Sequence, residues 1–331
     1  MKQLSTIQIK LLEALADGLC HNGNALGAQL GVSRTAVWKQ IKQLINLGLP
    51  IIRLPKIGYR LPRPMTLLNE QTIKQHLLNF GYTEPMNVHL FASLDSTNRL
   101  LKDIPISSTT DVCCAETQTQ GRGRFGRHWH SPFGENIYCS SRWHFNCDLS
   151  RLSGLSLVVS LAVVATLNTF YDHGDIYIKW PNDLLWQGKK LCGSLIEMFA
   201  ESNGGVDVII GIGLNVNSAT NEHHLPDTLW CSLYEITGKQ FDRNAIIASL
   251  MLHLGRYLGL FMEQGFIAFI QTWQQFDYLH GQLINVSQLS GQLSGMAAGV
   301  NEAGQLILID KAGTIHHLSA GDTSLKPLNC S

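Results

Sequence analysis

One stretch of the chain has no charged residue over eighteen positions, and it constrains the fold more than any other feature of the sequence. Residues 153–170 read SGLSLVVSLAVVATLNTF, which is long enough for a membrane-spanning helix. The stretch also contains three serines, two threonines and an asparagine, and it stands alone in the middle of the chain. We therefore expect a helix buried in the core of a large domain, and no membrane partner.

Charge is distributed unevenly along the 331 residues, a length sufficient for two or three domains. The formal net charge is zero, yet residues 1–63 carry nine Lys/Arg against two Asp/Glu, a net charge of +7. The remainder of the chain therefore carries −7. This asymmetry indicates that the first segment contacts a polyanion while the rest has another task.

Cysteine and histidine usage argues against a metal or disulfide framework. The eight cysteines are scattered without a CxxC pair, and the thirteen histidines include no HExxH sequence. Neither pattern is typical of a zinc site or of a secreted disulfide scaffold. We expect a cytoplasmic protein in a reducing environment.

The basic first segment has the pattern of a winged helix-turn-helix. STIQ at residues 5–8 is a capping box and predicts a first helix, and residues 24–30 predict a short second one. Ser33 is placed to cap a third helix that ends at Gly48. Residues 51–61 then read as two short strands around a glycine turn, which would form the wing. The LPRPM sequence at 61–65 should end this domain near residue 63.

The third helix is the expected DNA-reading element. Val37, Ile41, Leu44 and Ile45 form one apolar stripe, which we expect to be buried. The residues expected to face outward and to contact DNA are Ser33, Arg34, Thr35, Trp38, Lys39 and Lys42. An ordinary solvated amphipathic helix is the alternative, but the wing and the +7 charge favour DNA binding.

A glycine-rich loop at residues 121–127, GRGRFGR, matches G-x-G-x-x-G. A dinucleotide fold would need a strand before this loop and a helix after it. The preceding CCAETQTQ turns polar, and Pro132 and Gly134 interrupt the segment where that helix should lie. Instead, the glycines would let the backbone approach a ligand, and the three arginines suit phosphates or carboxylates. A disordered cationic surface loop is the alternative.

Four further segments accompany the loop: LDSTN at 94–98, IKWPNDLL at 178–185, KKLCGSLIE at 189–197 and VDVIIGIGLNVN at 206–217. IKWPNDLL predicts a short apolar strand that Pro181 breaks, and VDVIIGIGLNVN predicts an apolar strand that ends in a glycine turn. Together with the loop, these segments resemble the biotin-protein ligase family. With the winged helix included, the whole chain resembles the bifunctional biotin operon repressors of bacteria.

This resemblance implies an α+β multidomain fold. Residues 1–63 would be the winged helix-turn-helix domain. Residues 64–272 would be a catalytic domain with a mixed sheet and helices, similar to class II aminoacyl-tRNA synthetases. Residues 273–331 would form an SH3-like β-barrel, which agrees with the strand-like runs separated by glycine turns from Gln282 onward.

The resemblance also implies the reaction and the partners. Biotin and ATP, with Mg²⁺, would give biotinyl-5′-AMP, and biotin would pass to a lysine of the biotin carboxyl carrier protein of acetyl-CoA carboxylase. Loaded with biotinyl-AMP, the protein would form a homodimer and repress at operator DNA. The arginine loop would order over the intermediate and keep water from it.

Site residues follow from the family's motifs. Biotin-binding positions would be Ser96, Thr97, Asn98, Gln118, Gly121, Arg122, Lys190 and Gly193. Nucleotide-binding positions would be Arg124, Arg127, Trp129, Asn215 and Trp230. Arg122 and Lys190 would be catalytic where the two reactants meet, and Asp183 would bind Mg²⁺ as a hard oxygen ligand.

Several alternatives remain open at this point. Lys190 could belong to a solvated lysine pair, Trp230 could be a packing residue, and Trp129 and Trp180 also fit a core. Phe125 replaces a basic residue of the repressors, and Lys326 replaces an expected arginine. A biotin-sensing regulator without catalysis and a lipoate or octanoate ligase are the competing functions. The retained Arg122, Asp183 and Lys190 disfavour the first, and the polar ring positions disfavour the second.

Overall fold

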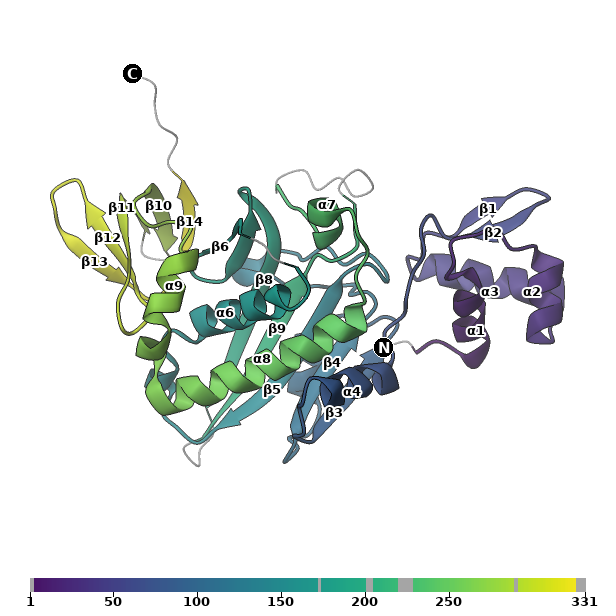
Figure 1. The fold of residues 1–331 in the computed structure, drawn as a ribbon, viewed down its shortest axis with the longest axis horizontal. Coiled ribbons are helices and arrows are strands. Elements are labelled where there is room, and N and C mark those ends of the chain that lie inside the picture. The colour runs from purple at the N-terminus through teal and green to yellow at the C-terminus, as the bar shows by residue number, and fades with distance from the viewer. Residues whose placement is uncertain (1–2, 172–173, 201–204, 220–228, 289–290, 326–331) are drawn as a thin grey trace, which may run out of the picture.

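The computed structural model describes residues 3–171, 174–200, 205–219, 229–288 and 291–325. Lys326, one of the two departures from the family pattern, lies outside the described residues. Three regions follow one another along the chain: a small helical unit, a large sheet with helices, and a C-terminal sheet (Figure 1).

The first region is a helix-turn-helix with a hairpin. Its elements are α1 (Thr6–Leu15), α2 (Gly23–Leu30), α3 (Arg34–Asn46), β1 (Ile52–Leu54) and β2 (Gly58–Arg60). Ser5 and Gln8 form the predicted capping box, and the Ser33 hydroxyl caps α3 by accepting from the Ala36 amide. The strands pair antiparallel, so the predicted wing is present.

The apolar stripe of α3 is narrower than predicted. Val37, Ile41 and Leu44 are buried in a separate cluster with the leucines of α1, but Ile45 is 43% exposed. The prediction for Ile45 was wrong because the helix turns this position past the edge of the contact with α1, one residue before its end at Asn46.

The central region is built on a seven-stranded sheet with the order β3-β4-β5-β9-β8-β7-β6. Its strands are β3 (Met86–Phe91), β4 (Thr110–Ala115), β5 (Ile137–Phe145), β6 (Ile176–Lys179), β7 (Asp183–Trp186), β8 (Lys189–Ala200) and β9 (Val206–Leu214). Only β3 and β4 run parallel; the other neighbours are antiparallel. The two strands predicted here from apolar runs are confirmed as β6 and β9, with Pro181 in the turn between β6 and β7, whereas β8 was not predicted.

Helices cover both faces of this sheet. Three of them, α4 (Glu70–Asn79), α6 (Leu155–Asn168) and α8 (Arg243–Gln264), lie on one face, where α8 packs against both others (Figure 1). The short α5 (Thr97–Asp103) lies on the opposite face. The alternation along β4 shows this, because Val112 packs in the core with α6, whereas Cys113 packs in a second cluster with α5.

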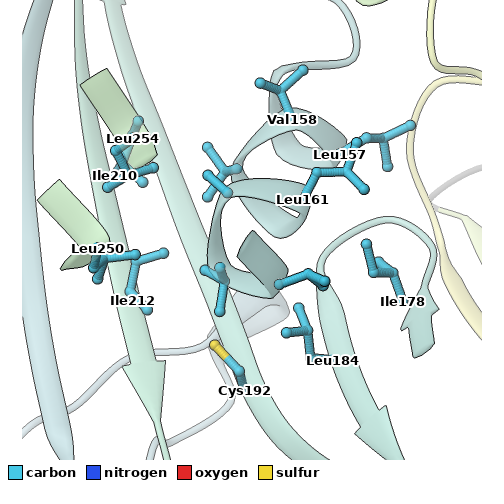
Figure 2. Packing of buried hydrophobic residues seen from close by; sticks show 14 of the residues in the cluster. Leu157, Val158, Leu161, Ile178, Leu184, Cys192, Ile210, Ile212, Leu250 and Leu254 are labelled. Carbon is cyan, nitrogen blue, oxygen red and sulfur yellow. The ribbon is translucent and has the colours of Figure 1, made fainter. Parts of the chain in front are cut away.

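The uncharged stretch forms α6 and is a core helix, as predicted. Leu157, Val158 and Leu161 of this helix share one apolar cluster with the sheet residues Ile210 and Ile212, beside which Leu250 and Leu254 of α8 lie (Figure 2). By length and composition alone, Leu149–Asn168 and Arg243–Gln264 could each cross a membrane, but 61% of each tested window is buried inside the protein. Packing against the sheet therefore accounts for their apolar character.

The C-terminal region is a five-stranded antiparallel sheet with the order β13-β12-β11-β10-β14. Its strands are β10 (Leu283–Gln288), β11 (Gly291–Val300), β12 (Leu306–Asp310), β13 (Ile315–Leu318) and β14 (Asp322–Leu325). It follows the elements α7 (Leu233–Thr237), α8, η3 (Phe266–Phe269) and α9 (Ile270–Phe276). Ile284 and Leu306 share one apolar core with the central sheet, and the buried Trp180 donates to the Gly304 carbonyl.

The segment that joins the first two regions is fixed to the central sheet. The buried Arg243 guanidinium donates to the Thr66 carbonyl at 2.7 Å and forms an ion pair with Glu116 at 2.8 Å. Asn244 donates to the Leu67 carbonyl at 3.2 Å. The start of α8 therefore holds the chain that leads away from the helix-turn-helix.

Candidate active site

A cavity of about 990 Å³ opens over the sheet beside α5, the glycine–arginine loop and the first residues of β14. Its volume lies at the upper end of the range of small-molecule sites. The predicted site residues that line it are Ser96, Thr97, Asn98, Gln118, Arg122, Arg124, Arg127, Trp129, Asp183, Lys190, Gly193, Asn215 and Trp230. Six segments distant in sequence thus meet at one place.

Gly121 is the predicted residue that does not line the cavity. It is buried, and a Cβ there would lie 2.5 Å from the Trp129 carbonyl oxygen, which is too close for any side chain at this position. The Trp129 amide donates back to the Gly121 carbonyl at 2.9 Å. Gly121 therefore allows the two ends of the loop to close on each other.

One end of the cavity presents small polar groups. The Gln118 side-chain oxygen accepts from the Thr97 amide at 2.9 Å, and the Gln118 nitrogen lies 3.4 Å from the Ser131 hydroxyl. Ser96 precedes α5 as its N-cap residue, but its side chain makes no capping bond and is buried beside the cavity. These donors and acceptors suit a neutral ligand that needs both.

The loop lies across the cavity, and each of its three arginines binds different partners. Arg122 forms an ion pair with Glu197 of β8 at 2.9 Å. Arg124 donates to the Asn182 side chain and to the Gly321 carbonyl, each at 3.0 Å, and Arg127 pairs with Asp322. The loop is thus connected to both the central and the C-terminal sheets.

The turn of the loop explains why it is not a dinucleotide fingerprint. Its centre is a three-residue 3₁₀ turn, Arg124–Gly126, where the fingerprint requires a full helix. Phe125 adopts φ 55° in the left-handed region and is 57% exposed, and the Arg124 guanidinium lies over its ring, 5.0 Å from the centre. The departure from the family pattern therefore places an aromatic ring where a cation was expected.

Lys190 and Asp183 form the second charged group of the site. Their ion pair measures 2.8 Å, and the Lys190 ammonium also lies 5.5 Å from the centre of the Trp129 ring. A Cβ at Gly193 would lie within 3.2 Å of the side chains of Lys190 and Trp129, so glycine makes room for them. Lys190 is therefore not part of a solvated lysine pair, since it faces the cavity while Lys189 is exposed.

Mg²⁺ commonly binds proteins through one or two carboxylates and the phosphates of a substrate. Among the described residues there is no group of three or more His, Cys, Asp or Glu side chains that could cage a metal. Asp183 does face the cavity, with Asp322 lining it as well. This donor set fits a magnesium ion that arrives with phosphates and does not fit a tightly caged metal.

Tryptophan and asparagine side chains line the remaining wall. Trp129 lies over the sheet, where a Cβ at Gly213 would be only 2.4 Å from its ring. Asn215 donates to the carbonyls of Lys190 and Cys231 at 3.3 and 3.1 Å, and so fixes the strand end that carries Lys190. Trp230 is 9% exposed and lines the cavity. Trp180, expected in the core, is buried there.

Sequence reasoning missed several residues of the site. Lys179 lines the cavity, and burial lowers the pKa of its ammonium group, with Asp183 and Asp322 opposing that shift. Ser194 was also missed, and its hydroxyl, like the indole nitrogen of the predicted Trp129, is buried at the cavity with no hydrogen-bond partner among the described residues. Lys179 directly precedes the WPND sequence, so proximity to a motif was the available signal.

All six predicted DNA-contacting residues are exposed on α3 or at its N-cap. They are Ser33, Arg34, Thr35, Trp38, Lys39 and Lys42. Trp38 is 45% exposed, and the Lys42 ammonium lies 5.6 Å from the centre of its ring. The outward face of this helix is therefore cationic and available to a polyanion.

Comparisons with known proteins agree with this arrangement. Residues 90–215 match the biotin/lipoate A/B protein ligase family, and residues 8–60 match an HTH domain. The bifunctional ligase/repressor BirA of Escherichia coli (strain K12) is 33% identical over 323 residues, 97% of this chain and 98% of that protein. The chain belongs to the bifunctional ligase/repressor BirA family.

Other members of this family and a solved ligase support the assignment. BirA of Bacillus subtilis (strain 168) is 33% identical over 302 residues, 88% of this chain and 90% of that protein. A biotin protein ligase from Aquifex aeolicus, solved in complex with biotin and ATP, is 30% identical with a TM-score of 0.61. It covers 72% of this chain and 98% of its own, so the family's ligase fold is present here.

Proposed function

We propose that this protein is a biotin-protein ligase that also represses transcription through its winged helix. The observation that carries the proposal is the single cavity in which the polar ring-binding set around Thr97 and Gln118 meets the cations Arg122 and Lys190. Membership of the bifunctional ligase/repressor family supplies the reaction class.

In the first step, a carboxylate oxygen of biotin attacks the α-phosphorus of ATP and pyrophosphate leaves, which gives biotinyl-5′-AMP. Anions are brought together while charge moves onto the leaving group, so cations that are already in position lower the barrier. Arg122 and Lys190 would act where the reactants meet, and Arg124 and Arg127 would hold the phosphates. Trp129, Trp230 and Asn215 would hold the adenosine part.

Ser96, Thr97 and Gln118 would bind the ureido ring, and Gly193 would let it approach the sheet. Asp183 would hold Mg²⁺ together with the nucleotide phosphates, and the ion would neutralise charge that develops on them. The loop would act as a lid that keeps water from the mixed anhydride.

In the second step, the amine of an acceptor lysine attacks the carbonyl carbon of the anhydride, AMP leaves, and the amine loses a proton. The acceptor would be the biotin carboxyl carrier protein of acetyl-CoA carboxylase. We assign no residue of this chain as the base for that proton.

The regulatory half of the proposal concerns the whole molecule. Operator DNA would bind to the cationic face of α3 and to the wing, and biotinyl-AMP would act as the corepressor by favouring a homodimer. We further infer a cytoplasmic protein, domain boundaries near residues 63 and 272, and an SH3-like barrel in the C-terminal sheet. The second of these boundaries falls within α9.

Biotin-dependent exchange between ATP and pyrophosphate tests the proposed enzyme, with lipoate as the parallel substrate. Exchange with biotin and not with lipoate is expected. No exchange with either acid from folded protein would favour a regulator that senses biotin without catalysis. Exchange with lipoate alone would identify a lipoate ligase.

A further inference from the structure

Arg122 is held by one side chain whose role nothing in the sequence indicated. Both oxygens of Glu197 lie within hydrogen-bond distance of the same terminal nitrogen, Nη2, at 3.1 and 2.9 Å. In the part of the chain that the structure describes, no other side chain bonds to this guanidinium. Nε and Nη1 are thus left as donors for a ligand oxygen.

Glu197 is itself connected to the segment that receives the ring of the substrate. The Asn98 amide nitrogen donates to Glu197 at 2.8 Å and to the Leu195 carbonyl at 3.2 Å. These two acceptors fix which end of the amide is nitrogen. The amide oxygen then lies 2.6 Å from the hydroxyl of Ser140, a fully buried residue of β5.

Two hydroxyl groups extend this chain of hydrogen bonds to the ring end of the cavity. The Ser140 hydroxyl also lies 2.6 Å from the Thr97 hydroxyl, which lies 3.2 Å from the Gln118 side-chain oxygen. Because the Asn98 oxygen can only accept, the single Ser140 proton goes to Asn98, and the single Thr97 proton goes to either Ser140 or Gln118. A continuous series of short polar contacts therefore links Thr97, at the ring end of the cavity, to Arg122.

The backbone makes room for this series. Gly211 of β9 lies opposite Asn98, and a Cβ at Gly211 would be 2.1 Å from the amide oxygen. Along β8, Gly193, Leu195 and Glu197 alternate onto one face. Strand geometry thus places the Glu197 carboxylate on the same face as Gly193, beside the cavity.

A carboxylate at this place has an electrostatic cost. The substrates are anions, and a negative charge next to their binding cation weakens the attraction between them. Its compensation is geometric, because an arginine on a glycine-rich loop has many rotamers, and a bond at one terminal nitrogen restricts them while the other donors stay available.

We propose that Glu197 is a positioning residue that orients Arg122 toward the reacting carboxylate and phosphate, and that Asn98 couples this orientation to the ring-binding segment. The proposal rests on the proposed function, since Arg122 must act in adenylation for Glu197 to act through it.

A double-mutant cycle on biotin-dependent pyrophosphate exchange tests this. Glu197→Ala should lower kcat by about ten- to a hundredfold, the loss typical of a misplaced catalytic group, with a smaller change in the KM for ATP. Glu197→Gln, which keeps one acceptor for Arg122, should recover part of the rate. In an Arg122→Ala background, Glu197→Ala should cause no further loss.

Glu70→Ala serves as the matched control, because Glu70 pairs with Lys74 at 2.7 Å on the surface of α4, outside the cavity. It should leave exchange unchanged. Thermal unfolding of each variant checks the fold, and if Glu197→Ala is unstable, the same cycle is run with Glu197→Gln.

Other outcomes would overturn the proposal in distinguishable ways. An unchanged kcat in Glu197→Ala, or losses that add in the double variant, would remove the positioning role and leave the ligase intact. Full activity of Arg122→Ala would also remove the positioning role, because Glu197 would then have no catalytic side chain to orient. Absence of exchange in the wild-type protein would instead refute the proposed function, and this inference with it.

Discussion

At the scale of single residues, the site depends on side chains whose neighbours are glycines. The predicted site residues came from motifs. A strand sequence such as VDVIIGIGLNVN also shows where glycines leave the backbone without side chains. Glu197 and Ser140 were not predicted, because each lies in an apolar strand and its hydrogen-bond partner is distant in sequence. Glu197 binds Arg122, 75 positions away, and Ser140 bonds to Thr97, 43 positions away. A sequence motif does not contain that distance information.

Lys190→Ala should lower biotin-dependent pyrophosphate exchange by about a hundred- to a thousandfold, a loss typical of removing one preorganised charge-stabilising group. The reason is that the ammonium pairs with Asp183 inside the cavity and lies 5.5 Å from the centre of the Trp129 ring. Lys189→Ala, the exposed neighbour, is the control and should retain the wild-type rate. Equal rates in the two variants would remove Lys190 from the mechanism.

Gly213→Ala should raise the KM for ATP by about tenfold or more, the worth of an aromatic stacking contact. The new methyl group would lie 2.4 Å from Trp129 and displace its ring from the cavity wall. Gly259→Ala in α8 is the matched control, because a Cβ there meets nothing within 4 Å. It should leave the KM unchanged and stabilise the helix by about 0.5–1 kcal/mol. Steady-state exchange at varied ATP would separate the two variants.

At the scale of elements, local chemistry predicted more than long-range pairing did. Capping by Ser5 and Ser33 is written within four residues, so the helices of the first region were predictable. The neighbours β5 and β9 are separated along the chain by five other elements, whose arrangement the sequence does not show. Ile45 was misplaced because a stripe shows which residues are apolar but not where the partner helix stops.

One buried ion pair attaches α5, and with it the residues proposed to bind the biotin ring, to the sheet. Arg142 of β5 binds Asp111 of β4 at 2.6 Å and donates to the carbonyls of Leu101, Ile104 and Pro105 at the end of α5. Breaking such a pair usually costs about 3–5 kcal/mol. The element that carries Thr97 therefore depends on a charge pair that does not line the cavity.

The stability that Asp111 contributes should depend on pH. Burial alone would raise the pKa of Asp111, but hydrogen bonds from His89, Arg142 and Asn87 hold that pKa below its ordinary value of 3.8. The unfolded chain then binds the proton more tightly than the folded one. The stabilisation is therefore complete above the ordinary pKa and is lost as the pH falls through the folded-state pKa.

Urea unfolding between pH 7 and pH 3 tests this expectation. The wild-type free energy of unfolding should fall more steeply below about pH 4 than that of Asp111→Asn, which is already destabilised at pH 7. Asp103→Asn, an exposed carboxylate of α5, is the control and should follow the wild-type curve. Parallel curves for wild type and Asp111→Asn would contradict the assignment.

At the scale of the whole molecule, the charge asymmetry of the sequence corresponds to two groups of cations in different surroundings. The cations of α3 are exposed, whereas those of the loop are engaged at the cavity. The order of these regions was predictable from charge and prolines. The attachment of the linker by Arg243 was not, because it joins residues 177 positions apart.

Lys39→Ala/Lys42→Ala should weaken binding to mixed-sequence duplex DNA and lower the slope of log affinity against log salt by about 2, one phosphate contact for each lysine. Pyrophosphate exchange should be unaffected, because both lysines lie outside the cavity. Lys74→Ala/Lys102→Ala removes the same charge from the central region and should change neither quantity. A salt slope equal to that of the wild type would exclude this face of α3 from the DNA interface.

The contacts of the loop with Gly321 and Asp322 also have a consequence in time. Arg124 and Arg127 take these anchors from the start of β14, the last strand along the described chain. A ribosome therefore releases the DNA-binding helices before these two residues. A growing polypeptide would have the helices that recognise DNA before it has a fully anchored loop. The ability to report on the supply of biotin is acquired only after the first residues of β14 have been synthesised.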